Sequence, residues 1–163
     1  MGSMALIAAK CSDGKYRRII CGNDGYLGYT GKVLDEVYKE QEKVDALMKL
    51  GDLRLLGASL EHTVNDWGIF GTCPPVKSGM ATRCVVYSDG FLVDGIKSDP
   101  RYDEFDSEDD LIDAFFHLDK ARMDYNYYFK DGQWYFFDWI DESAFDWVPL
   151  GSDDARRIEL DRR

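Results

Sequence analysis

The chain has 163 residues, of which 45% are hydrophobic and 14% aromatic, and a formal net charge of −11; this length and apolar content predict one domain with a proper core. Residues 99–154 hold 17 acidic residues against 4 basic ones, and such a region repels nucleic acid phosphates, so we expect no direct nucleic acid binding. No run approaches the roughly 18 apolar residues of a membrane span, and no signal-peptide pattern is present, so we expect no membrane association and a cytoplasmic location.

The boundaries of the domain follow from composition. Residues 1–3 read as a remnant of expression, with Met4 as the natural start. Residues 4–154 are expected to form a single α+β domain. The segment 155–163 is rich in charge and poor in apolar residues, so we expect a charged C-terminal tail that frays or forms a short exposed helix.

The first strand-like runs flank an Asp-Gly pair. Asp-Gly favours a two-residue hairpin loop because both turn positions take positive φ. Asp13-Gly14 therefore predicts a hairpin between residues 5–11 and 15–21. In this register Ser12 pairs with Lys15, and Ile7 pairs with Ile20.

Residues 21–32 carry four glycines at three-residue spacing and lead into a helical pattern. We expect Thr30 to be the N-cap of that helix. Apolar residues at helical spacing cover 33–38 and, after a polar interruption, 44–50, and Gly51 is typical of a helix end. Two short helices or one bent helix are therefore predicted.

The glycine stretch is also a candidate ligand site. A glycine-rich turn before a helix exposes backbone N–H groups that favour an anion, and nearby basic and aromatic side chains suit a nucleotide-like small molecule. The candidate ligand-binding residues are Arg17, Arg18, Gly22, Gly25, Tyr26, Gly28, Tyr29 and Lys32. Alternatively, the glycines serve only tight packing, because their spacing is not the dinucleotide fingerprint and Asp24 lies among them.

Residues 61–83 contain Pro74-Pro75 and three glycines. This composition predicts an irregular loop, which is long for a compact domain and therefore mobile or functional. Directly after it, Asp89-Gly90 predicts a second hairpin that pairs Tyr87 with Leu92 and Val86 with Val93.

A third helix is expected to begin near Ser107. Serine is a good N-cap, and the three acids that follow it favour the positive end of a helix. Its buried stripe is predicted to be Leu111, Ile112, Phe115 and Phe116.

Asp131-Gly132 gives the clearest hairpin signal, between residues 125–130 and 133–139. This register places Phe129 opposite Trp134, and Tyr127 opposite Phe136. Both faces of the hairpin are apolar, so we expect a central hairpin that is covered on both sides. The whole pattern predicts an α+β fold, in which an antiparallel sheet built from Asp-Gly hairpins carries two or three helices on one face.

The sequence offers no recognisable catalytic motif, metal site or cofactor site. Its cysteines form no CxxC pair and are accompanied by only two histidines. Cys21 with Asp24 as base is a conceivable hydrolytic pair, but no nearby group would lower the pKa of the thiol. We therefore expect a non-catalytic protein.

Two segments carry a resemblance. Residues 16–57 are similar to the opening of a family of small acidic bacteriophage and prophage proteins, in which a strand ends in Cys-His-Trp-Asp-Gly-Tyr-Pro and a segment of the form EKV…LGDLSSLG follows. Residues 42–57 match the second pattern, and 125–139 resemble the aromatic hairpin of that family; together these cover about half of the chain. The matches to the first motif are Cys21, Asp24, Gly25 and Tyr26, with Gly31 at the helix start, whereas Gly22, Asn23 and Leu27 replace its His, Trp and Pro. The resemblance implies a phage setting and no reaction.

In that setting a small, acidic, aromatic-rich protein is expected to bind and inhibit a host protein, in the host cytoplasm, through charge complementarity with a basic surface. Host defence proteins that handle nucleic acids carry such surfaces. The candidate partner-binding residues are Asp103, Glu104, Asp106, Glu108, Asp109, Asp110, Trp139, Phe145 and Trp147. Two alternatives stay open: sequestration of a nucleotide-like small molecule at the glycine turn, and an immunity protein against a basic nuclease toxin. The sequence leaves the oligomeric state open, including a homodimer.

Overall fold

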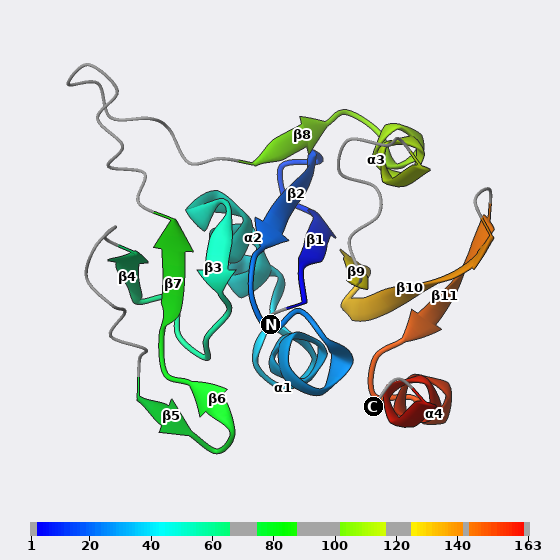
Figure 1. Cartoon of the computed structure of the whole chain (residues 1–163). Coiled ribbons are helices and arrows are strands. Elements are labelled where there is room, and N and C mark those ends of the chain that lie inside the picture. Colours follow the sequence, from blue (N-terminus) through cyan, green and yellow to red (C-terminus); the bar gives the residue numbers. More distant parts are fainter. Residues whose placement is uncertain (1–2, 66–74, 88–101, 117–124, 142–143, 162–163) are drawn as a thin grey trace.

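A computed structural model describes residues 3–65, 75–87, 102–116, 125–141 and 144–161. Within them, a sheet runs across the molecule in the order β11-β10-β9-β1-β2-β3-β7-β4, and β8 pairs with β2 beside this path (Figure 1). A separate hairpin is made of β5 and β6. Among the described residues, no helix has the length and apolar character needed to cross a membrane.

The strands are β1 (Ala5–Lys10), β2 (Tyr16–Cys21), β3 (Leu53–Leu55), β4 (His62–Asn65), β5 (Val76–Lys77), β6 (Met80–Ala81), β7 (Cys84–Tyr87), β8 (Asp103–Phe105), β9 (Tyr125–Lys130), β10 (Gln133–Asp141) and β11 (Ala144–Pro149). The helices are the π-helical turn η1 (Leu27–Gly31), α1 (Lys32–Val37), α2 (Gln41–Leu50), α3 (Glu108–Phe116) and α4 (Asp153–Asp161).

The α+β class is confirmed, but the sheet is mixed and not purely antiparallel. β1 runs parallel to β9, β2 to β3, and β4 to β7. The first of these pairings is formed by strands from opposite ends of the chain. Turn chemistry indicates which strands are joined by a hairpin, but it carries no information about how separate hairpins meet, and this is why the parallel pairings were missed.

The first hairpin forms with a register that differs by one residue from the prediction. Ile7 pairs with Ile19, and Lys10 pairs with Tyr16. The N–H of Cys11 donates to the carbonyl of Lys15 at 2.8 Å, and Gly14 has φ 84°, so the loop has three residues and ends in a left-handed glycine. A one-residue shift moves side chains to the other face, so Ile19 and not Ile20 joins Ile7.

The third hairpin forms as predicted, with Phe129 opposite Trp134 and Tyr127 opposite Phe136. Asp131 and Gly132 both have positive φ, at 52° and 78°, as a type I′ turn requires. The second predicted hairpin, around Asp89-Gly90, lies mostly outside the described residues.

The expectation of an irregular loop over residues 61–83 is wrong for its described parts. β4 adds a strand beside β7, and β5 pairs with β6. Ser78 and Gly79 have φ of 55° and 76°, so Ser-Gly makes a two-residue hairpin turn of the same kind as Asp-Gly. Ser78-Gly79 is a hairpin signal in the sequence, but the prolines and glycines around it are typical of a loop.

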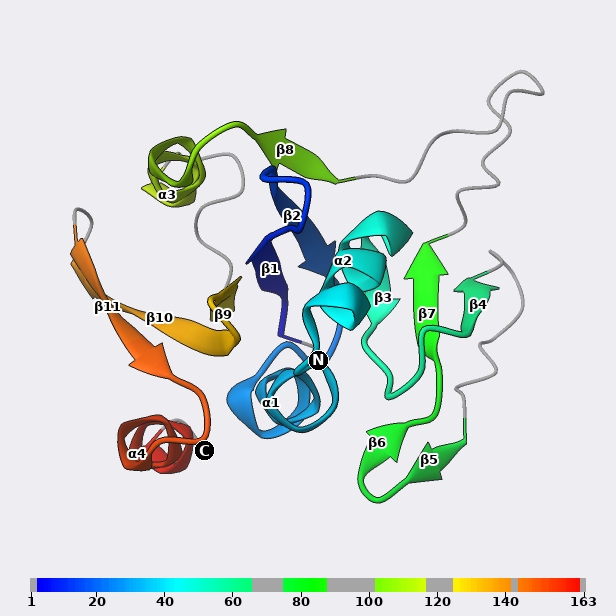
Figure 2. The ribbon, with the colours of Figure 1, turned by 180° about the vertical axis from the view of Figure 1, so that it is seen from behind.

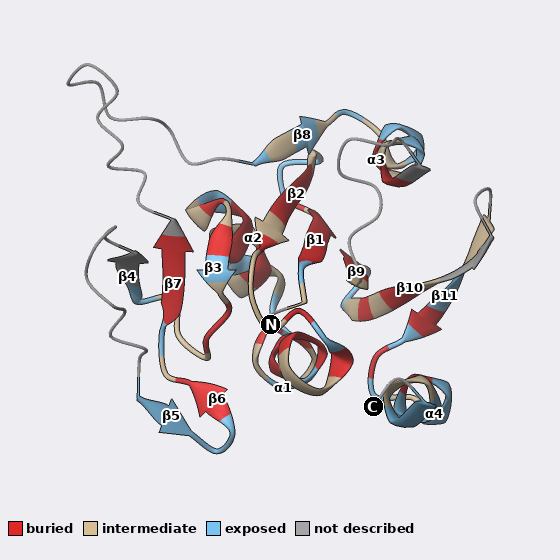
Figure 3. Cartoon of the chain, viewed as in Figure 1, coloured by how far each residue is buried: buried red, intermediate tan, exposed pale blue. Residues whose placement is uncertain are grey.

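Consecutive residues of the central strand β1 are buried, from Ala5 to Ala9 (Figure 3). Along β1, Ala5, Ile7 and Ala9 belong to a main core, whereas Leu6 and Ala8 belong to a second core on the opposite face. The side chains of a strand alternate between faces, so β1 is covered on both. This agrees with a central aromatic hairpin covered on both sides, because β9 and β10 divide their aromatic residues in the same way.

Helices therefore pack on both faces and not on one, as Figure 2 also shows. α1, α2 and α4 contribute buried residues to the main core, whereas α3 contributes Leu111 and Phe115 to the second core. Because α3 is the helix rich in acids, the second core places those acids over the aromatic hairpin.

The helix ends follow the predicted signals with one exception. Ser107 Oγ accepts from the N–H of Asp110 at 3.1 Å, and Gly51 ends α2 with φ 80°. Thr30 is not an N-cap: it lies inside η1, and its hydroxyl donates to the carbonyl of Asp24 at 2.7 Å. The described part of the charged segment, residues 155–161, belongs to α4, whose Ala155 is buried.

Candidate protein-binding surface

The glycine stretch is a packing junction between η1, β1, β9 and α4. A Cβ on Gly25 would lie 2.7 Å from the Cβ of Ala5, and one on Gly28 would lie 2.7 Å from Oε1 of Glu159. The hydroxyl of Tyr127 donates to the carbonyl of Gly25 at 2.6 Å. These glycines allow the turn to approach its neighbours closely, and the same contacts fill the space that a phosphate cradle would need.

The candidate ligand residues do not assemble into one site. Arg17 and Arg18 lie in the first half of β2, whereas the glycine turn follows the end of that strand. Tyr29 is engaged by the protein itself, because its hydroxyl donates to the carbonyl of Leu56 at 2.7 Å and accepts from the N–H of Ala81 at 3.1 Å. Gly22 donates its N–H to the carbonyl of Leu53. Of the two tyrosines predicted to bind a ligand, only Tyr26 is exposed, at 43%.

A groove of about 230 Å³ does lie beside the turn, between α1 and α4. Gly28 and Lys32 line it, and Arg156 adds a second cation. Three carboxylates line the same groove: Asp35, Glu36 and Glu159. The acids outnumber the cations, so the groove is electrostatically unfavourable for a phosphate.

The cysteine that fits the phage motif is inert. Cys21 is fully buried, and its thiol donates to the carbonyl of Asn23 at 3.3 Å. Burial raises the pKa of this thiol to about 11, so it carries no thiolate for a nucleophilic attack. The described residues contain no group of three or more metal-ligating side chains placed to hold an ion.

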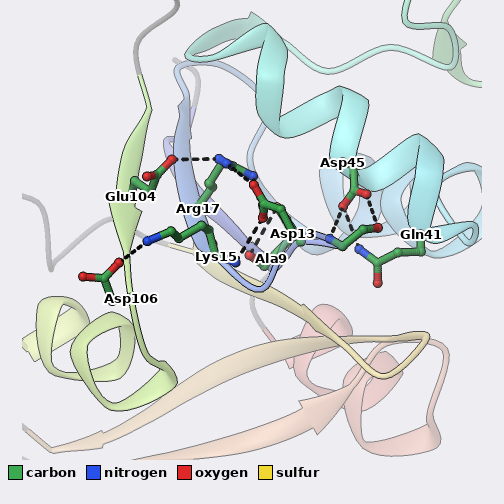
Figure 4. Close-up of polar contacts among 10 residues, drawn as sticks. Ala9, Asp13, Lys15, Arg17, Gln41, Asp45, Glu104 and Asp106 are labelled. Carbon is green, nitrogen blue, oxygen red and sulfur yellow. Dashed lines mark hydrogen bonds and ion pairs between the residues drawn. The ribbon is translucent and has the colours of Figure 1, made fainter.

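The acids of β8 form ion pairs with basic residues of β2, and Asp106, directly after β8, pairs with Lys15, directly before β2. The strands pair Arg17 with Glu104 and Arg18 with Asp103. Arg17 donates to Glu104 at 3.1 Å and to Asp13 at 2.6 Å, and Lys15 binds Asp106 (Figure 4). The arginines that the sequence predicted to bind a ligand thus pair with acids that it predicted to bind a partner.

Arg18 has the most buried of these ion pairs. Its side chain is 6% exposed and donates to Asp103 at 3.0 Å and to the carbonyl of Ala114 in α3 at 3.2 Å. The guanidinium also lies over the rings of Phe105 and Phe115, at 5.4 and 5.6 Å from their centroids. Arg18 therefore joins β2, β8 and α3, and its role is structural.

Of the three acids in the first turn of α3, one forms an ion pair and two are exposed. Both oxygens of Glu108 accept from Lys130, at 3.0 and 2.9 Å. Asp109 and Asp110 are exposed, and no ion pair to either exists among the described residues. These two candidates keep their charge available to a partner.

The aromatic candidate Trp147 lies next to this turn. Its ring is packed against Tyr128, Tyr135 and Phe137, with centroid distances of 5.4, 5.5 and 5.1 Å, yet the residue remains 36% exposed. Lys130 lies 5.8 Å from the centroid of this ring while it pairs with Glu108. One lysine side chain therefore connects Trp147 to the acidic turn of α3.

The other two aromatic candidates are placed less favourably. Phe145 stacks on Phe137 at 4.4 Å and is half-buried in the second core. Trp139 lies in β10 opposite Phe145, but its side chain lies outside the described residues. Of the three, Trp147 is the one whose exposed ring the structure describes.

We call Asp109, Asp110 and Trp147 the acidic aromatic surface. Asp146 precedes Trp147 in β11 and is exposed, but side chains alternate along a strand, so its carboxylate lies on the opposite face of the sheet. Sequence reasoning missed that β8 pairs with β2, although Lys15, Arg17 and Arg18 form the densest basic run of the first half and could have been matched to the densest acidic run. Comparisons with protein family models, curated proteins and solved structures find no match to this chain.

Proposed function

We propose that this chain is a non-catalytic phage or prophage protein that binds and inhibits a host protein with a basic surface, in the host cytoplasm. The observation that carries the proposal is the acidic aromatic surface. After the acids of β8 have formed ion pairs within the protein, two carboxylates of α3 and the ring of Trp147 remain exposed around one lysine.

The chemistry of this surface fits a protein partner. Large aromatic residues that are held rigidly and ringed by polar groups are typical of the residues that dominate interface energies. Trp147 is held by three rings, so little conformational entropy is lost when a partner covers it. The acids add charge complementarity, which accelerates association with a basic surface and favours it over an acidic one.

Inhibition of a nucleic-acid-handling defence protein follows from the same chemistry. Such a protein presents cations that normally bind phosphates, and carboxylates on a stable scaffold compete for them. An immunity protein that neutralises a basic nuclease toxin would use the same surface, so the identity of the captured partner distinguishes these two functions.

Sequestration of a nucleotide-like molecule has weaker support. The groove beside the glycine turn offers Lys32 and Arg156, neither of which forms an ion pair among the described residues. The carboxylates of the groove oppose a phosphate, so we rank this function second. Nucleotide that co-purifies with the protein, seen as absorbance at 260 nm, would reverse the ranking.

The proposal is tested by affinity capture from a nuclease-treated bacterial lysate at low and high salt, followed by an activity assay of the captured protein. We expect basic proteins to be retained at low salt. Retention should fall several-fold for Asp109→Asn with Asp110→Asn, and for Trp147→Ser, because these changes remove the charge and the ring.

The matched control is Glu40→Gln with Glu42→Gln, which removes two exposed carboxylates from the start of α2. This variant has the same net charge as the α3 variant, so it should retain the partner. Equal retention by all the variants, or no basic protein retained at low salt, would contradict the proposal.

A further inference from the structure

Lys130 holds a cation next to the acidic aromatic surface. It is the last residue of β9, and its ammonium donates to both carboxylate oxygens of Glu108, at 3.0 and 2.9 Å. The same ammonium lies 5.8 Å from the centroid of the Trp147 ring. Carboxylates and aromatic rings are the groups with which proteins bind cationic side chains. This place is therefore a cation site, which the free chain occupies with its own lysine.

The aromatic part of the site is held in place by neighbouring strands. Trp147 of β11 contacts Tyr128 of β9 and Tyr135 of β10, with centroid distances of 5.4 and 5.5 Å and interplanar angles of 75° and 63°. Tyr128 and Tyr135 also lie directly opposite each other in the ladder. Because Trp147 stays 36% exposed, its ring can contact a ligand without first changing its position.

The hydroxyl of Tyr128 is an unused polar group at this site. Tyr128 has no exposed surface, and among the described residues no group lies in hydrogen-bonding geometry with its hydroxyl. Burial raises the pKa of this phenol, and the charge of Glu108 raises it further, so the hydroxyl stays protonated close to the carboxylate. Buried hydroxyls in native proteins are nearly always hydrogen-bonded. A donor bound between Glu108 and Tyr128 would satisfy the oxygen of this one.

The ion pair that fills the site is easily opened. The side chains of Lys130 and Glu108 are 32% and 29% exposed, so water reaches both charges and the pair is weak. Glu108 raises the pKa of Lys130, and the exposed Asp131 in the adjoining turn adds to this rise. The ammonium therefore stays under the influence of a second carboxylate when it leaves Glu108.

A guanidinium matches these groups better than the ammonium does. It is planar and carries five N–H donors, so it can bond both oxygens of Glu108 in parallel and still have donors left. Its flat face also stacks on an aromatic ring. An arginine side chain can therefore bond Glu108, cover Trp147 and donate to Tyr128 at the same time. The exposed acids Asp109 and Asp110 add attraction from the same turn of α3.

We propose that the partner inserts an arginine side chain between Glu108 and Trp147 in place of Lys130, and that its guanidinium also donates to the hydroxyl of Tyr128. Lys130 is then an internal competitor, which lowers the affinity of the free protein for its partner. Removal of this lysine should strengthen binding, whereas removal of the Trp147 ring should weaken it. This inference rests on the proposed function and names the side chain that the partner must present.

The test uses the full chain and three acetylated, amidated tripeptides in which the central residue, between two glycines, is arginine, lysine or citrulline. Citrulline has nearly the shape of arginine but carries no charge. The indole N–H signal of Trp147 in NMR titrations gives the dissociation constants. We expect the arginine peptide to bind at about 10 mM and the lysine peptide about threefold more weakly. The citrulline peptide should not bind.

The variant Lys130→Met tests the competition. It empties the site and keeps a side chain of similar length, so the arginine peptide should bind about fivefold more tightly. Lys49→Met, which removes an exposed lysine from α2, is the matched control. It changes the net charge equally and should bind as the parent does. Glu108→Gln removes the carboxylate that the guanidinium needs, and binding should fall about tenfold.

The variant Tyr128→Phe isolates the hydroxyl. It should weaken binding of the arginine peptide about threefold and leave binding of the lysine peptide unchanged. The hydroxyl has no partner in the free protein, so the midpoint of urea unfolding should not fall. A lower midpoint, or an unchanged affinity for the arginine peptide, would contradict the role given to Tyr128.

Three results would overturn the arginine site: equal binding of the arginine and citrulline peptides, no gain for Lys130→Met over Lys49→Met, or no loss for Glu108→Gln. Tighter binding of the lysine peptide would assign the site to an ammonium group instead. If capture of basic proteins still depends on Trp147 and the exposed acids of α3, the proposed function survives such a result. If capture also loses that dependence, the proposed function fails as well.

Discussion

Cys21 shows at the scale of one residue how burial decides chemistry. The thiol lies at the end of β2 with no exposed surface and donates to a backbone carbonyl. Removal of its proton would place a charge in the main core, so burial raises the pKa to about 11 from an ordinary value of 9.0. Cys21, one of the residues on which the resemblance to a phage family rests, is therefore a packing residue.

The raised pKa of Cys21 makes stability depend on pH in the alkaline range. Between pH 9.0 and about 11 the folded protein keeps a proton that the unfolded chain has lost. The free energy of unfolding should therefore fall as pH rises through this window, by on the order of 2–3 kcal/mol for this group. Cys21→Ala should flatten the slope, measured by urea unfolding at several pH values.

The cavity left by Cys21→Ala lowers stability at every pH, so the slope and not the offset is the diagnostic quantity. Cys11→Ala is the control, because burial also raises the pKa of Cys11, whereas the nearby guanidinium of Arg17 opposes that rise. An unchanged slope for Cys21→Ala would show that the thiol is accessible to water.

β8 and α3 together show how a charged element is fixed at the scale of secondary structure. β8 pairs with β2 through only three residues, and a pairing this short is weak alone. Arg18 adds hydrogen bonds to Asp103 in β8 and to the backbone of α3. The acidic aromatic surface therefore depends on a buried arginine for the position of its helix.

Arg18→Met tests this dependence. The change keeps the apolar stem but removes the hydrogen bonds of the guanidinium to Asp103 and to the carbonyl of Ala114, so we expect a loss of about 2–3 kcal/mol in the free energy of unfolding. Lys15→Met removes an ion pair whose two side chains are exposed, and its effect should be much smaller. Urea unfolding at neutral pH measures both, and equal losses would contradict the structural role of Arg18.

At the scale of secondary structure, the sequence predicted individual turns and helix ends better than it predicted which strands pair. Local signals identified the type I′ turn at Asp131-Gly132, the cap at Ser107 and the end of α2 at Gly51. The register at Asp13-Gly14 was missed because a three-residue loop and a two-residue loop share the same Asp-Gly pair. The pairing of β8 with β2 was missed because it joins residues that are more than 80 positions apart.

For the whole molecule, net charge was a poor guide to the proposed binding surface. The acidic run that dominates the sequence is divided by the fold into acids that pair with β2 and acids that stay exposed. The sequence alone cannot separate these two sets. Acids that are neighbours along the run differ in the folded protein, where one forms an ion pair and another stays exposed. Residue type makes Trp147 a candidate anchor, but its exposure and its contact with Lys130 could not be predicted from the sequence.

The two cores share the central strands, and this makes a prediction about cooperativity. Ile7 belongs to the main core, and its neighbours Leu6 and Ala8 belong to the second core. Loss of either core would leave β1 and β9 with an uncovered apolar face, so neither core is expected to persist alone. We expect one unfolding transition for the whole sheet.

Leu47→Ala in the main core and Phe115→Ala in the second core test this expectation, because both side chains are fully buried. Each should cost about 2–5 kcal/mol through lost burial and a residual cavity. Each should also lower a single midpoint that near-UV and far-UV circular dichroism report together. If Phe115→Ala instead splits the transition and leaves the main core at its original midpoint, α3 and the second core are a separate unit. The acidic aromatic surface could then be released without global unfolding, whereas a shared midpoint means that a partner meets it already formed.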